Sequence, residues 1–303
     1  MASPIIKGST YQTSLPLIIA VLIISTAAIL VRGAHNEGAT SNTIAFLRLA
    51  IASICLGLIS SRSIINGIRC CDAKTMFKSA LSGIFLAVHF MTWIVSLEYI
   101  SVAKSTFLVT TSPIWVVLLS WIVLKETISR KQLIGILIAT GSAFFLFSFA
   151  EETLISQGQR SIKGELLATL GAISVAAYLI IGRMLRQTIE LKVYVFLTYT
   201  FATITLVLYN LSSIKQLAPD ISGSAWIYIF CLALGPQLIG HTILNWGVRR
   251  FPATLVSTIV LAEPIVASAL AWIILNEAIG LNSLLGFSGI ILGIFLTTRY
   301  YKR

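Results

Sequence analysis

Two stretches of the chain decide its fold: TSPIWVVLLSWIVLKETISRKQLIG at residues 111–135 and AEPIVASALAWIILNEAIGLNSLLG at residues 262–286. When the chain is slid along itself by 151 residues, one stretch lies over the other, and 11 of the 27 residues at positions 109–135 are identical. Apolar composition alone would not align the most distinctive pairs, which are Pro113 with Pro264, Trp121 with Trp272, Glu126 with Glu277 and Gly135 with Gly286. The chain is therefore predicted to consist of two repeats, residues 1–150 and 151–303.

The composition places these repeats in a membrane. Hydrophobic residues make up 57% of the 303 residues and charged residues only 11%, whereas a soluble domain carries roughly 25% charged residues. The mean hydropathy is +0.92, and at about 20 residues per span the chain can supply about ten helices. The predicted spans are residues 15–32, 43–61, 76–97, 101–124, 131–149, 162–182, 193–213, 224–247, 253–275 and 280–298.

The placement of Lys and Arg gives the formal net charge of +11 a topological meaning. Of the 22 Lys and Arg residues, 16 lie on the side of the chain ends, five lie on the other side, and Arg48 falls inside the second span. Because segments rich in Lys and Arg stay in the cytoplasm, we expect both termini there and no nucleic acid as partner. The chain has no long Ser/Arg-rich leader, which favours a bacterial inner membrane.

The two repeats are predicted to have inverted topology. Each holds five spans, and because five is odd, the first repeat starts in the cytoplasm and the second starts outside. Inverted repeats are frequent in secondary transporters, where the substrate site lies near the midplane between the repeats. The sequence thus predicts an all-α membrane protein with ten transmembrane helices in two inverted five-helix repeats around a central cavity.

Three segments resemble the drug/metabolite transporter superfamily, in particular its ten-spanning EamA-type transporters. They are FLRLAIA at residues 46–52, the run from LEYISVAKST to RKQLIG at residues 97–135, and the run from GVRRFPATLV to NSLLG at residues 247–286. The resemblance implies two EamA domains and a cavity lined mainly by spans one, three, four, six, eight and nine. It also implies export or exchange of small metabolites, without indicating which one.

Two charged residues inside the spans are candidates for coupling or charge pairing, because an ionisable group there costs roughly 2.5–3.5 kcal/mol on insertion scales. Glu263 could carry a proton or pair a cationic substrate group. Alternatively, it lies near the cytoplasmic end and hydrogen-bonds a loop or helix terminus. Arg48 could pair Glu263 or bind a substrate carboxylate, or it could snorkel or form a structural salt bridge.

Polar and aromatic residues in five spans are candidates for lining the cavity. Gln237, His241 and Asn245 are spaced by four residues in span eight, which places them on one helix face, and Gly235-Pro236 could break this helix. Interhelical packing is the alternative for this stripe. The other candidates, which could equally be ordinary buried or interfacial side chains, are His89 and Trp93 in span three, Thr106 and Thr110 in span four, and Tyr178 in span six.

Several residues that recur or cluster are expected to serve the architecture. Pro113 and Pro264 should loosen spans four and nine at matching places and could be paired gating kinks. Glu126 and Glu277 fall at helix ends, where we expect them to hold the turns. Three glycines in span ten predict close helix packing or a contact in a possible homodimer; they are Gly286, Gly289 and Gly293.

The favoured function is a secondary transporter that exports or exchanges a small organic metabolite, such as an amino acid or related amine, by alternating access. An intramembrane enzyme would need paired acids or a metal motif in the spans, and we expect no catalytic residue, metal site or cofactor. A scaffold would not explain inverted halves. A carrier of nucleotide sugars or phosphorylated metabolites would need several cavity cations, and Arg48 is the only cation deep in a span.

Overall fold

The computed structural model describes residues 10–100, 102–154, 161–217, 221–275 and 281–301, and every regular element in these ranges is a helix. The helices of the first repeat are α1 (Thr10–Ile24), α2 (Ala27–Asn36), α3 (Ser41–Arg69), α4 (Ala73–Ser96), α5 (Val102–Thr110), α6 (Ser112–Leu119), the π-helix η1 (Ser120–Leu124) and α7 (Arg130–Leu154). Those of the second are α8 (Ile162–Leu185), α9 (Leu191–Tyr209), the 3₁₀ helix η3 (Leu211–Gln216), α10 (Gly223–Leu232), the π-helix η4 (Ala233–His241), α11 (Thr242–Arg250), α12 (Ala253–Val260), α13 (Glu263–Leu275) and α14 (Leu281–Arg299).

These helices form the predicted spans. In the described ranges, nine segments are long and apolar enough to cross a membrane, and α7 covers the remaining predicted span, 131–149. The second span is longer than predicted, because α3 continues past residue 61 to Arg69 with a kink at Ser60. Asp72 then begins the next helix by accepting a hydrogen bond from the backbone N–H of Thr75 at 2.8 Å.

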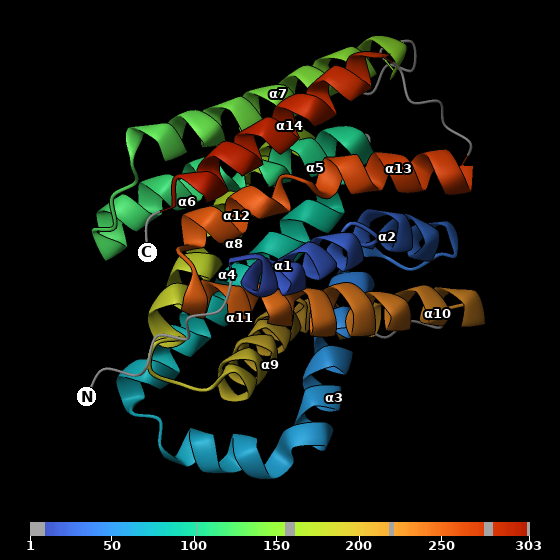
Figure 1. Cartoon of the computed structure of the whole chain (residues 1–303). Helices are drawn as coiled ribbons and strands as arrows, with labels where there is room; N and C mark the ends of the chain where they lie inside the picture. The colour runs from blue at the N-terminus through green and yellow to red at the C-terminus, as the bar shows by residue number, and fades with distance from the viewer. Residues whose placement is uncertain (1–9, 101, 155–160, 218–220, 276–280, 302–303) are drawn as a thin grey trace.

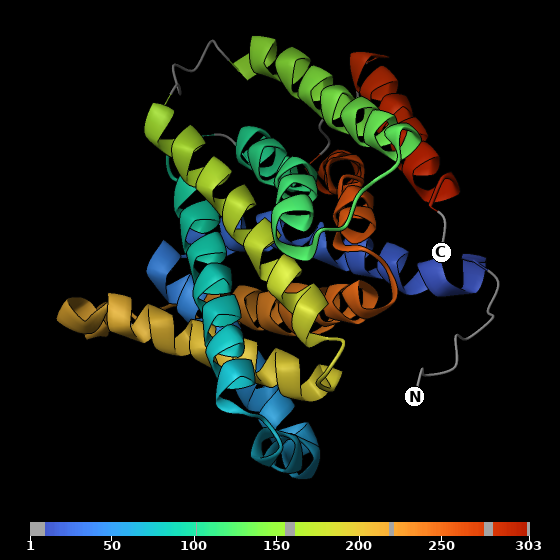
Figure 2. The same cartoon turned by 90° about the vertical axis from the view of Figure 1, so that its left-hand side faces the viewer.

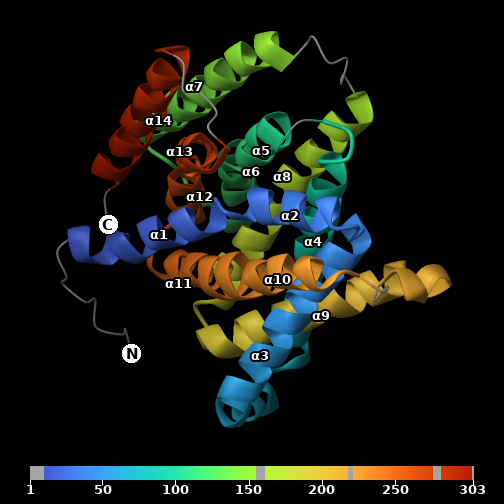
Figure 3. The same cartoon turned by 90° about the vertical axis from the view of Figure 1, so that its right-hand side faces the viewer.

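The two repeats pack on each other as inverted copies. Helix α4 of the first repeat lies along α8 of the second, and at the equivalent place α10 and η4 of the second lie along α2 and α1 of the first. Figures 2 and 3 show these two pairings on opposite sides of the bundle. Helices α7 and α14 pack on each other and form a separate layer, seen at the top of Figure 1.

The small-residue face of α14 packs against α7 of the same chain. A Cβ added at Gly293 would lie 2.5 Å from both the backbone N of Ala139 and the carbonyl oxygen of Gly135. Only glycine therefore allows the two backbones to approach this closely. Gly286 and Gly289 face Leu146 and Ser142 in the same way. Of the two expectations for these glycines, helix packing within the chain is the one that the structure shows.

The distribution of side chains is that of an integral membrane protein. Large apolar side chains are exposed around the bundle, including Leu58 at 78%, and Trp121 and Trp272, an equivalent pair, at 61% and 55%. Polar side chains such as Arg48 and Gln237 are buried inside it. A lipid environment explains both, because apolar surface needs no shielding from hydrocarbon and polar groups do.

Candidate functional site

A central cavity of about 60 Å³ lies between the two repeats. Its lining comes from the six spans implied by the family resemblance, together with Arg48 of α3. The other lining residues are Ile24, Ala27, His89, Phe90, Trp93, Thr106, Val109, Thr110, Ser112, Val175, Leu179, His241, Leu244, Ser257, Val260 and Glu263. Small-molecule pockets usually measure about 300–1,000 Å³, so the cavity in this conformation holds only a few water molecules.

The lining follows the internal repeat. Many lining residues occur in pairs 151 positions apart, namely Ile24 and Val175, Thr106 and Ser257, Val109 and Val260, and Ser112 and Glu263. Equivalent residues of inverted repeats meet only close to the pseudo-two-fold axis that relates the halves. The cavity therefore lies on this axis, where inverted-repeat transporters bind substrate.

Two broken helices cross at this cavity. Helix α5 ends at Thr110 and α6 begins at Ser112, while α12 ends at Val260 and α13 begins at Glu263. The backbone repeats the same hydrogen bonds at both breaks, from Thr111 N to Leu108 O at 3.2 Å and from Ala262 N to Ile259 O at 3.1 Å. Prolines follow both breaks and have no N–H, so they donate no helical bond to the carbonyls four residues earlier. Those carbonyls belong to Val109 and Val260, which line the cavity.

Glu263 lies deep in the bundle at the first residue of α13. It is ten residues past the start of α12 at Ala253, about 15 Å along the span at about 1.5 Å per residue. That depth is half of the roughly 30 Å hydrocarbon core. The carboxyl is only 8% exposed and faces the cavity, and the helix start favours a negative charge there. Glu263 thus lies about midway along its span rather than near the end of it.

Arg48 joins the two repeats inside the bundle. Its side chain is 1% exposed, its Nε donates a hydrogen bond to Gln237 Oε1 at 3.1 Å, and its Cζ lies 3.8 Å from the centre of the Phe90 ring. Nη1 is buried without a hydrogen-bond partner. Among the described residues, Arg48 forms no ion pair with Glu263 or another carboxylate, and it does not snorkel. The cavity is therefore lined by a basic and an acidic side chain that do not pair with each other directly.

Two histidines face each other across the pseudo-two-fold axis. The ring centres of His89 and His241 are 6.4 Å apart, and Trp93 stacks parallel to His89 at 6.4 Å. The Nδ1 atom of His89 lies 2.9 Å from the carbonyl oxygen of Gly171, so this nitrogen is the donor. Nδ1 of His241 is buried with no partner. The two histidines, which the 151-residue shift aligns only with a one-residue adjustment, therefore differ in what they can offer to a ligand.

Three residues predicted to line the cavity, Tyr178, Gln237 and Asn245, are not part of its lining. Residues 233–241 form a π-helix and residues 242–250 a regular α-helix, and of the three residues in the predicted stripe only His241 lines the cavity. Gln237 holds Arg48 through its side chain and accepts a hydrogen bond from Tyr199 at its backbone carbonyl, at 2.9 Å. Asn245 donates to the Tyr178 hydroxyl and to the carbonyl of His241. The backbone carbonyls of Gln237 and His241 thus accept hydrogen bonds from side chains of the protein.

The cavity has further polar lining that the sequence reasoning used only in part. Thr110 donates to the Phe107 carbonyl at 2.9 Å, whereas Oγ1 of Thr106 and Nε1 of Trp93 are buried without partners. Ser112 and Ser257 also line the cavity and were missed. The 151-residue shift would have found both, because it aligns Ser112 with Glu263 and Ser257 with Thr106.

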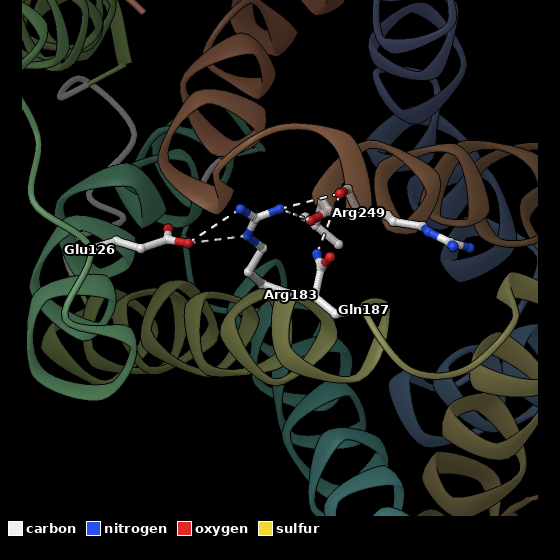
Figure 4. A network of polar contacts seen from close by, with 5 residues as sticks. Glu126, Arg183, Gln187 and Arg249 are labelled. Atoms are coloured by element: carbon white, nitrogen blue, oxygen red, sulfur yellow. Dashed lines mark hydrogen bonds and ion pairs between the residues drawn. The ribbon is translucent and has the colours of Figure 1, made fainter. Parts of the chain in front are cut away.

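A second polar cluster lies at one end of the bundle, which we call the Arg183 end and define by Glu126, Arg183 and Arg249 (Figure 4). Glu126 Oε1 accepts from Nη2 of Arg183 at 3.2 Å and from its Nε at 3.3 Å. Nη1 of Arg183 donates to the Val248 carbonyl at 2.9 Å. Glu126, expected only to hold a turn, thus ties the first repeat to α8 and α11 of the second. Glu277 lies outside the described residues.

The inverted halves and the polar cavity on their axis define the class of inverted-repeat membrane transporters. The chain belongs to the EamA-like transporter family, whose model matches it twice, over residues 13–148 and 162–299.

Relatives with names agree with this class. "Uncharacterized transporter YetK" of Bacillus subtilis is 25% identical over 257 residues, which cover 83% of this chain and 76% of the relative. An "Uncharacterized transporter" of Archaeoglobus fulgidus is 26% identical over 261 residues, covering 84% of this chain and 88% of the relative. A solved structure described as "Crystal structure of protein" is similar in fold, with a TM-score of 0.74 at 18% identity, covering 97% of this chain and 100% of that chain.

Proposed function

We propose that this protein is a secondary transporter that exports or exchanges a small zwitterionic metabolite, an amino acid or a close relative of one, by alternating access. The observation that carries the proposal is the pair of opposite charges in the central cavity. Arg48 has a buried Nη1 with no partner, and Glu263 has a carboxyl facing the same space. A substrate with a carboxylate and an ammonium group would satisfy both charges at once.

The remaining lining suits the rest of such a substrate. Phe90 and Trp93 present aromatic surface, while the carbonyls of Val109 and Val260 receive no bond from the prolines that follow them. An ammonium group is attracted both to aromatic faces and to free carbonyl oxygens. Glu263 then binds either the ammonium group or a proton, but not both, which would couple transport to a proton gradient.

Alternating access follows from the two halves acting as units, residues 1–150 and 151–303. The central cavity is too small for a metabolite in this conformation, so binding requires movement of the spans around it. The breaks before Pro113 and Pro264 are the places where spans four and nine bend with the least loss of helical hydrogen bonding. We place the Arg183 end in the cytoplasm of a bacterial inner membrane, from its excess of Lys and Arg.

Other classes find less support in the lining. A phosphorylated substrate or nucleotide sugar would need several cations, and Arg48 is the one Lys or Arg among the described lining residues. Arg48 and Glu263 line a cavity between two inverted repeats, and neither an intramembrane enzyme nor a scaffold gives a reason for such repeats. In many secondary transporters inverted repeats supply the two alternating conformations.

The test is uptake into proteoliposomes of a pool of labelled amino acids, amines and nucleosides, with and without an inward acid gradient. Native protein is compared with Glu263→Gln, which keeps the shape of the side chain and removes its charge. Glu37→Gln is the matched control, because Glu37 is exposed and bonds Ser222 away from the cavity.

We expect saturable uptake of one or more amino acids that the acid gradient accelerates. Glu263→Gln should lose this acceleration, and Glu37→Gln should keep it. Uptake of amines or nucleosides but of no amino acid would reject the zwitterion. An acceleration that survives Glu263→Gln would reject Glu263 as the coupling group.

A further inference from the structure

The Glu126–Arg183 ion pair lies close to two cavities, because Glu126 lines one of them and Leu179, one turn before Arg183 on α8, lines the other. One is the central cavity, and the other, the Glu126 cavity, has a volume of about 320 Å³ at the Arg183 end. The Glu126 cavity is lined by Glu126, Thr127, Ile128, Gln132, Pro252, Thr254 and Tyr301. Helix α12 borders both cavities, with Thr254 in one lining and Ser257 in the other, and Ser257 Oγ donates to the Thr254 carbonyl at 3.1 Å. The wall between them is therefore about one helical turn, roughly 5 Å, thick.

The ion pair and its hydrogen bonds join the two repeats beside this wall. Glu126 follows η1 at the end of span four, Arg183 lies in the last turn of α8, and the carbonyls of Val248 and Arg249 end α11 (Figure 4). Gln187, one turn after Arg183, also donates to the Arg249 carbonyl at 3.3 Å. The guanidinium of Arg183, on α8 of the second repeat, thus links span four of the first repeat to α11 of the second at one point.

Removing one partner would open the wall rather than only weaken the fold. The pair is only partly exposed, with the Glu126 side chain at 35% and that of Arg183 at 21%, and Oε2 of Glu126 is buried without a partner. An unpaired carboxylate or guanidinium left there would draw water into the space between the cavities, because a charge without its partner needs hydration.

We propose that Glu126 and Arg183 form the gate of the Arg183 end: their contact holds this end shut, and its release joins the Glu126 cavity to the central cavity. The Glu126 cavity is then the vestibule through which substrate reaches the central site. The purpose of the gate depends on the proposed transport function. Its opening does not, because it can be measured without any substrate.

The experiment measures water access to the central cavity from the Arg183 end. The native cysteines at positions 55, 70, 71 and 231 are first replaced by serine, and Ser257→Cys places one thiol in the lining of the central cavity. Vesicles of known orientation are treated with a membrane-impermeant maleimide, and the alkylation rate is measured from each side. Glu126→Gln, Arg183→Gln and the double variant are compared with the unchanged gate.

We expect each single variant to raise the alkylation rate from the Arg183 end about tenfold, the change that corresponds to about 1.4 kcal/mol. The double variant should raise it no further, because the two residues act through one contact. Glu190→Gln, which removes an exposed carboxylate outside the Glu126–Arg183 contact, should leave the rate unchanged. Glu126→Asp keeps the charge but shortens the reach by one methylene, and should give an intermediate increase.

Three results would overturn the gate. The rate could stay unchanged in both single variants, rise equally from both sides of the membrane, or rise additively in the double variant. Transport assays are not needed for any of these readings. Failure of the gate therefore leaves the zwitterion proposal intact, and failure of that proposal leaves the gate measurement valid.

Discussion

Replacing Arg48 should change the half-saturation constant for substrate and the stability of the protein in different directions. Its guanidinium is buried, bonds Gln237 and stacks on Phe90, yet Nη1 has no partner. A substrate carboxylate at that nitrogen would form a charge-assisted hydrogen bond worth about 1.5–3 kcal/mol. Arg48→Met keeps most of the side-chain volume and removes this bond. The half-saturation constant for an amino acid should therefore rise roughly 10- to 150-fold.

The stability of the folded protein should stay the same or rise in Arg48→Met, although substrate binding weakens. Replacing a buried, incompletely paired charge by an apolar side chain of similar volume is often neutral or stabilising by about 1–4 kcal/mol. Arg186→Met is the matched control, because Arg186 is also buried but bonds the carbonyls of Asn245 and Ile189 at the Arg183 end. This control should lower Tm and leave half-saturation unchanged.

The assay is counterflow in proteoliposomes with a transported amino acid and with the amine that remains when its carboxyl is removed. Native protein should prefer the amino acid, and Arg48→Met should accept both with similar half-saturation constants. If Arg48→Met kept the native preference, Arg48 would not be the carboxylate site. A Tm that fell as far as in Arg186→Met would show that Arg48 is mainly a structural residue.

Two further predictions concern the backbone. Pro113→Ala and Pro264→Ala supply the missing N–H and favour a continuous helix by about 3 kcal/mol each. Turnover in counterflow should therefore fall about tenfold, with little change in the half-saturation constant. Unchanged turnover in both variants would reject the breaks as bending points. Gly293→Ala should destabilise the protein by about 1–3 kcal/mol, because the new Cβ would lie 2.5 Å from two backbone atoms of α7. Gly141→Ala, whose Cβ would meet nothing within 4 Å, should keep or raise Tm, and equal Tm values for both variants would contradict the packing argument.

The sequence predicts the architecture well because the duplication encodes it. Two prolines 151 residues apart and an odd number of spans per repeat already imply inverted halves and matching breaks. The structure adds the place where the halves meet, which is the central cavity. Ser112 and Ser257 line it together with their equivalents in the other half, Glu263 and Thr106. A single helix pattern carries no information about where the halves meet.

The site was harder to predict where the backbone departs from regular geometry. A spacing of four residues in an α-helix would align Gln237 with His241, but residues 233–241 form a π-helix with Pro236 inside it. Gln237 accepts a hydrogen bond from Arg48, 189 residues away in the chain, and local helix spacing carries no information about such a partner. The Glu126–Arg183 contact likewise joins residues 57 positions apart, which no local pattern could indicate.

Helices α7 and α14 have a consequence for how the molecule can be handled. Gly135 contacts Thr297, and Gly286 contacts Leu146. The 151-residue shift takes Gly135 to Gly286 and Leu146 to Thr297, so the two contacts are equivalent and the interface maps onto itself. In the proposed alternating-access cycle an interface that maps onto itself stays the same in both states, so we expect these two helices to stay fixed while the other spans move. Their exposed side, marked by Ile134 and Leu285, is where we expect an attached fluorophore or crystallisation chaperone to leave the proposed transport intact.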